Sequence, residues 1–171
     1  MIDELARRQG ITVAALECNS LVGESVVGEG LRRVLVKPQT FMNRSGYAAR
    51  CLVERRDLRL DEILVVYDDV ALSLGRIRLK ASGGPGGHRG VESVLGELRT
   101  DEVARLRLGI APEEPPADLV DFVLAPFAQD EAAAVEEMVA RAADACEVWA
   151  SEGVGVAMNR FNVSLGGSLS G

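Results

Sequence analysis

This sequence has few histidines and lysines, and it has no long apolar run. Among 171 residues there is one histidine, His88, and there are only two lysines, Lys37 and Lys80. No apolar run approaches the roughly 20 residues needed to cross a bilayer. The first residues, MIDELARRQG, carry charges where a signal peptide has an apolar core. These absences exclude a membrane-spanning protein and predict a cytoplasmic one.

Cysteine is also scarce. There are three cysteines, Cys18, Cys51 and Cys146, an odd number, and they lie far apart in the sequence. Because there is also only one histidine, no spacing of ligands suggests a zinc site. We therefore expect three buried free thiols, no metal site and no cofactor.

The net charge of -7 argues mildly against nucleic acid as a partner. The charge is uneven, however, because residues 1–112 hold 17 basic and 15 acidic side chains, whereas residues 113–171 hold 2 and 11. Contacts with phosphate are local, so a basic face on an acidic protein remains compatible with RNA binding.

Hydrophobic periodicity predicts an alternation of strands and helices. We expect helices at 2–9, 45–57 (with Ser45 as N-cap), 88–98, 130–152 and 156–161, and strands within 13–27 and at 31–37, 63–67, 76–79 and 104–110. This mixture predicts an α/β fold, a single domain over 1–163 with a mixed, twisted sheet flanked by helices on both faces. The Gly/Ser tail, 164–171, is predicted to be disordered.

The glycine-rich stretch KASGGPGGHRGVES, residues 80–93, holds the only histidine. A Walker A loop needs Gly-Lys-Ser/Thr at its end, and none is present. A dinucleotide fingerprint fails because Arg89 occupies the last glycine position. Two interpretations remain, a loop of backbone N–H groups that receives a phosphate or carboxylate, and a turn that needs positive φ angles. His88 itself is either a general base or a structural hydrogen-bonding group.

Asp68 and Asp69 follow the apolar run Ile63–Tyr67, which is typical of a strand buried on both faces. In open α/β sheets ligands bind beyond the ends of such strands. A carboxylate there could orient a histidine or cap a turn. Asn43 follows the strand predicted at 31–37, and its amide could hold a substrate carbonyl, a ribose or a water.

Together these segments resemble the bacterial-type peptidyl-tRNA hydrolase family. The resemblance covers nearly the whole chain, in order and with compatible spacing. It is carried by KPQTFMNRSG (37–46), DEILVVYDD (61–69), GGPGGHRG (83–90), RLRLGI (105–110), VLAPF (123–127) and NRF (159–161).

The resemblance implies an enzyme that cleaves the ester joining a peptide to the 3′ end of tRNA, with peptidyl-tRNA as its substrate and a monomer as its form. In this family a histidine is the general base for water, and an aspartate stabilises it. Asp68 matches that aspartate. Asn43 matches an asparagine that contacts the substrate and helps to place the water.

Four further residues take roles by the same resemblance. Phe41 matches a residue lining the site of the terminal nucleotide, with Met42 beside it in support. His88 matches a histidine that supports the site and is not the base. Arg89 stands where the family usually has an asparagine that contacts substrate. An arginine lacks the acceptor of an amide, so the contacts at this position differ.

The family opens with a strand, a G-N-P-G and a T-R-H-N segment that includes the base histidine, and no match to that opening is present. Two explanations stay open, a protein that starts upstream of this sequence and a true short variant. Either way we expect this chain to be inactive as written. The alternative function is that of a non-catalytic relative that binds tRNA or other RNA.

Overall fold

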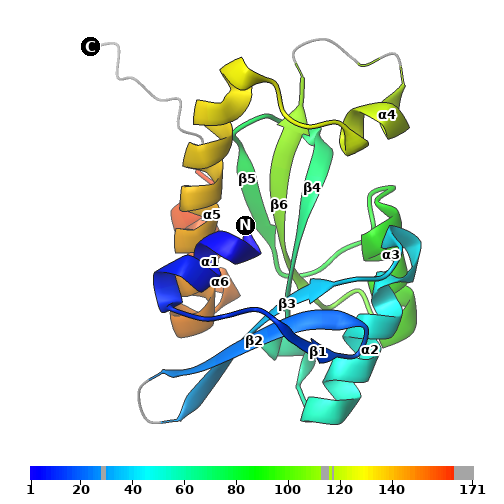
Figure 1. The fold of residues 1–171 in the computed structure, drawn as a ribbon, viewed down its shortest axis with the longest axis vertical. Coiled ribbons are helices and arrows are strands. Elements are labelled where there is room, and N and C mark those ends of the chain that lie inside the picture. Colours follow the sequence, from blue (N-terminus) through cyan, green and yellow to red (C-terminus); the bar gives the residue numbers. More distant parts are fainter. Residues whose placement is uncertain (28–29, 113–115, 117, 164–171) are drawn as a thin grey trace. The chain divides into compact units, whose positions relative to one another are not determined.

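A computed structural model describes residues 1–27, 30–112, 116 and 118–163. They form two compact units (Figure 1). The first unit comprises 1–65 and 82–103, and the second comprises 66–81 and the described residues from 104 onwards. The chain passes between the units three times, so each unit is assembled from separate stretches of sequence. The predicted Gly/Ser tail, 164–171, lies outside the described residues.

The first unit combines an antiparallel sheet with a pair of packed helices. Its elements are α1 (Ile2–Gln9), β1 (Ala15–Glu17), β2 (Ser20–Val27), β3 (Leu31–Pro38), η1 (Met42–Arg44), α2 (Ser45–Arg56), η2 (Leu60–Glu62) and α3 (Arg89–Leu98). The sheet has the order β1-β2-β3. Cys18 and Asn19 join β1 to β2 with φ angles of 49° and 55°, the two positive values that a two-residue hairpin turn requires.

Helices α2 and α3 lie side by side (Figure 1) and meet where α2 has no side chain. The Gly46 N–H donates to Ser93 Oγ at 3.0 Å, and a Cβ at Gly46 would lie 2.0 Å from the Ser93 carbonyl oxygen. The prediction that Ser45 is the N-cap is wrong. Its backbone is already helical, with φ -61° and ψ -24°, because η1 runs directly into α2, and its hydroxyl donates to the Met42 carbonyl instead.

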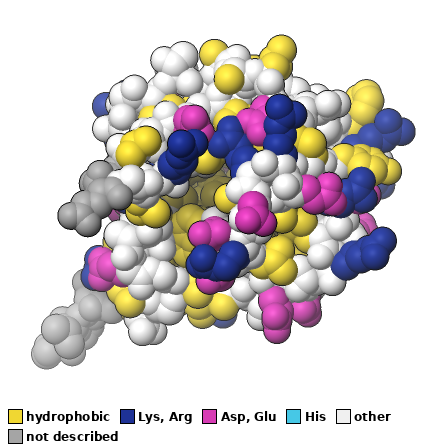
Figure 2. Space-filling model, turned by 90° about the horizontal axis from the view of Figure 1, so that it is seen from below, with side chains coloured by type: hydrophobic (Ala, Val, Ile, Leu, Met, Phe, Trp, Pro, Cys, Tyr) yellow, Lys and Arg dark blue, Asp and Glu magenta, His cyan; other side chains and the backbone are white. Residues whose placement is uncertain are grey.

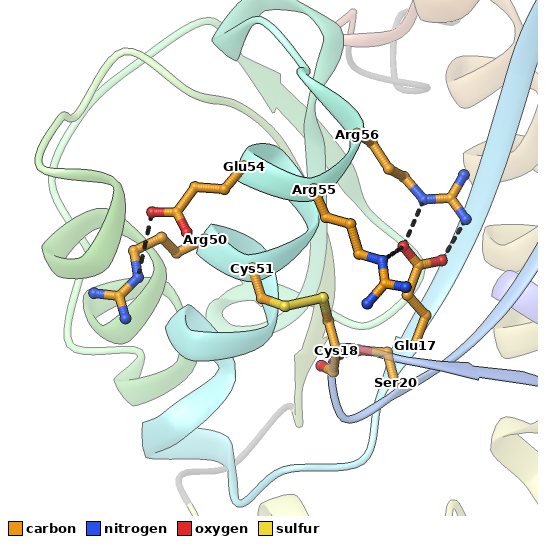
Figure 3. The surroundings of a disulfide bond; sticks show 8 residues. All are labelled: Glu17, Cys18, Ser20, Arg50, Cys51, Glu54, Arg55 and Arg56. Atoms are coloured by element: carbon orange, nitrogen blue, oxygen red, sulfur yellow. Dashed lines mark hydrogen bonds and ion pairs between the residues drawn. A yellow bond between two sulfur atoms is a disulfide. The ribbon is translucent and has the colours of Figure 1, made fainter.

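The cysteines differ from the prediction of three free thiols. Cys18 and Cys51 form a disulfide across 33 residues, whereas Cys146 is free and buried, and burial raises the pKa of its thiol to about 12. The prediction is therefore wrong for two of the three. Figure 3 shows the reason, since the β1–β2 turn brings Cys18 against the side of α2 that carries Cys51. Sequence spacing contains no sign of that approach.

Strand β4 (Leu64–Ser73) begins in the first unit and continues into the second. It was predicted to end before Asp68 and to be buried on both faces. Instead it extends through both aspartates, and its residues are half-buried or exposed. Within the strand the carboxylate of Asp69 accepts a hydrogen bond from Arg107 Nε at 2.5 Å, so this half-buried charge is compensated there.

The second unit places a sheet against two helices. Its remaining elements are β5 (Ile77–Lys80), β6 (Ala104–Ala111), α4 (Leu119–Leu124), η3 (Gln129–Glu131), α5 (Ala132–Glu152) and α6 (Val154–Phe161). The sheet order is β4-β6-β5, with β5 and β6 antiparallel. Leu79 and Leu106 face each other in that ladder and are fully buried. The predicted α/β class is confirmed.

The outer edge of β5 is closed by one side chain. Asn162, after α6, accepts the Leu79 N–H at 2.7 Å and donates to the Leu79 carbonyl at 3.0 Å. An amide thus takes the place of a neighbouring strand and satisfies both backbone groups. Arg141 of α5 holds the chain just before it, donating to the Phe161 carbonyl at 3.0 Å.

Candidate functional site

The segment Phe41–Met42–Asn43 lies between β3 and α2 in the first unit, with its side chains in solvent. Phe41 is 78 % exposed and Met42 56 % exposed, and Asn43 is exposed as well. Large apolar side chains held outward in a short, hydrogen-bonded segment are typical of a contact surface. The start of the segment is held because the Gln39 N–H donates to the Asn19 carbonyl at 2.8 Å.

The glycine-rich loop ends in a helix cap. Gly83, Gly86 and Gly87 have φ angles of 133°, 60° and 83°, so the interpretation as a turn that needs positive φ is confirmed. His88 is the N-cap of α3, and its Nδ1 accepts the Val91 N–H at 3.1 Å. In the neutral ring the proton is then on Nε2. Neither ring nitrogen of this tautomer offers a spare lone pair to a water.

The fold brings the Phe41–Asn43 segment next to the start of α3. A Cβ added at Gly90 would lie 2.4 Å from Met42 Sδ and 2.9 Å from His88 Cε1. Met42 therefore packs over Gly90, and η1 is seated beside His88 and the exposed Arg89. Five of the six residues named from the sequence thus share one small region of the first unit, with Phe41 and Asn43 at its edge, and Asp68 belongs to the second unit. The need for glycine at position 90 was missed, although the sequence His-Arg-Gly gave a visible signal of a close approach.

Asp68 and Asp69 are neighbours on β4, in the second unit, and their side chains lie in different surroundings. Side chains alternate along β4, so the two carboxylates point to opposite faces. Asp69 accepts from Arg107 Nε and from the Ala71 N–H, at 2.5 and 2.8 Å. Burial, together with the charge of Asp69, raises the pKa of Tyr67 on the same face. Asp69 is thus engaged in the structure of the strand, and half-buried Asp68 faces the other way.

Many of the arginines are occupied by carboxylates. Arg56 Nη1 lies 2.8 Å from Glu24 and its other nitrogens bind Glu17, and these hydrogen bonds lower the pKa of both glutamates. Arg50 lies 2.6 Å from Glu97 in the same way. On the face shown in Figure 2, dark-blue basic side chains accordingly lie next to magenta acidic ones. Much of the basic charge in the first unit is therefore paired with carboxylates of the same unit.

No group of three His, Cys, Asp or Glu side chains in 1–27, 30–112, 116 and 118–163 could hold a metal ion. Within the same ranges no helix combines the length and apolarity that a membrane span requires.

Comparison with known proteins gives one consistent result. The family model described as peptidyl-tRNA hydrolase matches residues 1–168. A peptidyl-tRNA hydrolase of Symbiobacterium thermophilum is 42% identical over 163 residues, which are 95% of this chain and 86% of that protein. One of Chloroflexus aggregans is 42% identical over 164 residues, which are 94% and 86%.

Solved structures agree. The crystal structure of peptidyl-tRNA hydrolase from Acinetobacter baumannii superposes with a TM-score of 0.85 at 27% identity, covering 95% of this chain and 82% of that one. The structural agreement supports the α/β fold with a mixed sheet. The sequence matches show the family as well as the fold. The chain therefore belongs to the peptidyl-tRNA hydrolase family.

Proposed function

We propose that this chain carries the site of an ester hydrolase that releases peptides from peptidyl-tRNA and so recycles tRNA, working as a monomer in the cytoplasm. The observation that carries the proposal is the family match over residues 1–168. In the first unit, the exposed Phe41–Asn43 segment beside the start of α3 supports it, because this arrangement offers an aromatic face and an amide together.

The proposed chemistry is attack of water on the ester carbonyl, with the 3′ oxygen of the tRNA as leaving group. A general base accepts the proton of the water, and a carboxylate stabilises the cation that forms on the base. We assign the carboxylate to Asp68, which matches the family's aspartate in sequence and lies on the face of β4 opposite to the Asp69–Arg107 pair. Asn43 is assigned to place the water and substrate, and Phe41 to receive the terminal base by stacking.

The remaining three residues are assigned supporting or binding roles. His88 caps α3 through Nδ1, which argues against its acting as the base. Met42, the middle residue of the exposed segment, packs over Gly90 and is assigned to support Phe41 and Asn43. Arg89 is exposed at the start of α3 and is assigned to a phosphate or carbonyl of the substrate, as a cationic donor without an acceptor.

His88 is the only histidine of these 171 residues, so the proposal includes that they lack the general base. Incubation with N-acetyl-aminoacyl-tRNA tests this, with the Symbiobacterium thermophilum relative in parallel. Since a general base contributes roughly 100- to 10,000-fold, we expect release of the N-acetyl amino acid at least about 100-fold slower than by the relative. Comparable turnover would contradict the absence of a base.

Binding tests the site assignments without requiring turnover. Phe41→Ala should weaken binding of the same substrate roughly 10-fold, because one base–aromatic stack is lost. Leu16→Ala is the matched control, since Leu16 is also exposed, at 82 %, and should leave binding unchanged. Binding should fall as salt rises. Equal effects of the two variants would refute the role of Phe41.

The capped state of His88 also favours a second candidate, a relative that binds tRNA without cleaving it. The two candidates separate when the coding sequence is expressed together with its upstream in-frame codons. An upstream segment containing G-N-P-G and T-R-H-N that restores hydrolysis supports the enzyme. Binding without cleavage by the extended protein supports the second candidate.

A further inference from the structure

The Cys18–Cys51 disulfide joins the β1–β2 turn to the middle of α2, within the first unit (Figure 3). Both cysteines are only partly buried. A hollow of ≈ 130 Å³ lies beside them, lined by Cys18, Asn19, Tyr47, Ala48 and Cys51. A small reagent in solvent can therefore approach the bond, unlike the thiol of Cys146, which is buried in the second unit.

This bond helps to hold both ends of the segment with the candidate site residues. At one end, Asn19 of the tethered turn accepts the N–H of Gln39 at 2.8 Å. At the other end, Cys51 lies in α2, which begins immediately after η1. The residues Phe41–Arg44 lie between these two anchors. They are held as well by the packing of Met42 over Gly90, by the Ser45 hydroxyl that donates to the Met42 carbonyl, and by the Arg44 N–H that donates to the Phe41 carbonyl.

The backbone at Cys18 gives a second, independent sign that this residue serves the bond. Its φ of 49° lies in the left-handed region, where Asn and Gly are favoured and a cysteine is unusual. Asn19, which follows with φ 55°, is a residue of the favoured kind. A cysteine at the first position is explained by its partner on α2, since the turn itself gains nothing from it.

We propose that Cys18–Cys51 is a reversible thiol–disulfide site that controls how firmly the Phe41–Arg44 segment is held. The expected redox environment of this site rests on the proposed function. Peptidyl-tRNA is made by ribosomes, in a compartment where low-molecular-weight thiols keep cysteine pairs reduced. There the bond forms when the thiol pool is oxidised and opens when that pool recovers.

The exchange balances with a small thiol as the only reductant. A thiolate entering the hollow attacks one sulfur, so a mixed disulfide forms and the other cysteine leaves as a thiolate. A second small thiol attacks the mixed disulfide and frees the remaining cysteine. Overall the protein disulfide and two small thiols become two protein thiols and one small disulfide. Opening removes the covalent link between the turn and α2, and the segment then depends on α3 for its position.

Amide hydrogen exchange followed by mass spectrometry tests this on the whole chain. Samples are equilibrated with glutathione disulfide or with dithiothreitol, and the state of each cysteine is read by alkylation. We expect exchange in a peptide covering 39–44 to be at least about 10-fold faster after reduction. Cys18→Asn suits the turn, so it should remove the tether without removing the hairpin and should exchange fast in both conditions. Cys51→Ala gives the same test from the other side of the bond.

Cys146→Ser is the matched control and should respond to reduction as the parent does. The proposal is overturned if Cys18 and Cys51 are both alkylated after equilibration with glutathione disulfide, or if exchange at 39–44 is the same in both states. None of these readouts needs hydrolysis or tRNA. A redox-dependent segment in a chain that fails to bind N-acetyl-aminoacyl-tRNA would refute the proposed function and leave this inference standing.

Discussion

The two sheets of the molecule are stabilised by different interactions. In β1–β3 only two of the described hydrophobic side chains, Val22 and Leu35, are buried, and the surroundings are tied by ion pairs and a disulfide. In β5 and β6 the buried set is much larger, consisting of Ile77, Leu79, Ala104, Leu106, Leu108 and Ile110. The first sheet therefore depends on individual links and the second on apolar burial.

The two sheets also carry different candidate site residues. The Phe41–Asn43 segment follows β3, so it adjoins the sheet whose links are sensitive to pH and to redox state. The sheet with the larger core carries Asp68 on β4, whose own residues are half-buried or exposed and whose neighbour in the sheet is the buried strand β6. The segment that we propose to bind substrate and the carboxylate that we propose to stabilise the base thus belong to sheets that different interactions stabilise.

Truncation of the apolar core should give the largest effect. Leu106 is fully buried in β6, so Leu106→Ala should lower the free energy of unfolding by about 4 kcal/mol through lost burial and a residual cavity. Urea denaturation measures it. Leu16→Ala in β1, where the side chain is exposed, should change the value by less than about 0.5 kcal/mol. Similar losses in the two variants would abolish the contrast between the sheets.

The close approach of α2 and α3 should give the next effect. Gly46→Ala places a methyl group 2.0 Å from the Ser93 carbonyl oxygen, and the helices must separate, at a cost of about 3 kcal/mol. Gly96→Ala in α3 meets nothing within 4 Å and should instead stabilise the protein by about 0.5–1 kcal/mol. Thermal unfolding of both variants distinguishes the signs. A neutral Gly46→Ala would mean that the helices do not meet there.

The side chain that closes β5 comes third. Asn162→Ala removes the amide that binds the N–H and the carbonyl of Leu79, which should cost about 2 kcal/mol. The control is Asn159→Ala, the same change at an exposed position of α6. Urea denaturation should show a clear loss only for Asn162. Equal small losses would show that the edge of β5 is satisfied without the amide.

The ion pairs of the first unit should give the smallest effect, and one that depends on pH. Arg56 lowers the pKa of Glu17 and Glu24 from 4.5, so its stabilisation is present above pH 4.5 and is lost as pH falls through the lowered folded-state values. Arg56→Ala should cost about 1 kcal/mol at pH 7. The gap to the parent should narrow in urea titrations below pH 4.5. Arg59→Ala is the control, because its pair with Asp61 is exposed, and it should change the free energy of unfolding little at either pH. If the difference between the parent and Arg56→Ala stayed constant below pH 4.5, Glu17 and Glu24 would not be the groups through which Arg56 stabilises the fold.

Local sequence signals predicted most of the elements. The helices at 2–9 and 130–152 and the strands at 31–37 and 104–110 are close to α1, α5, β3 and β6, because periodicity and terminal glycines act over a few residues. Two of the errors involve distant partners. β4 continues past Tyr67 and includes Asp69, which pairs with Arg107, and two cysteines predicted to be free meet because a hairpin turn reaches α2. The error at Ser45 is local, because η1 runs directly into α2.

The candidate site divides in the same way. The residues Phe41, Met42, Asn43, His88 and Arg89 were named from short motifs, and the structure seats their segments together through Met42 and Gly90. Their roles in binding and catalysis stay predictions. That His88 is used as a helix cap through Nδ1 was not visible in the sequence, since a glycine-flanked histidine is equally compatible with a base.

By itself, the sequence determined the α/β class, the family motifs and the lone histidine, since all of these depend on residue types and short spacings. Tertiary structure alone decided that Asp69 binds Arg107, that Cys18 and Cys51 are bonded and that the Asn162 amide closes the edge of β5. Each of these depends on the approach of residues tens of positions apart, and the direction of that approach is set by packing rather than by spacing along the chain.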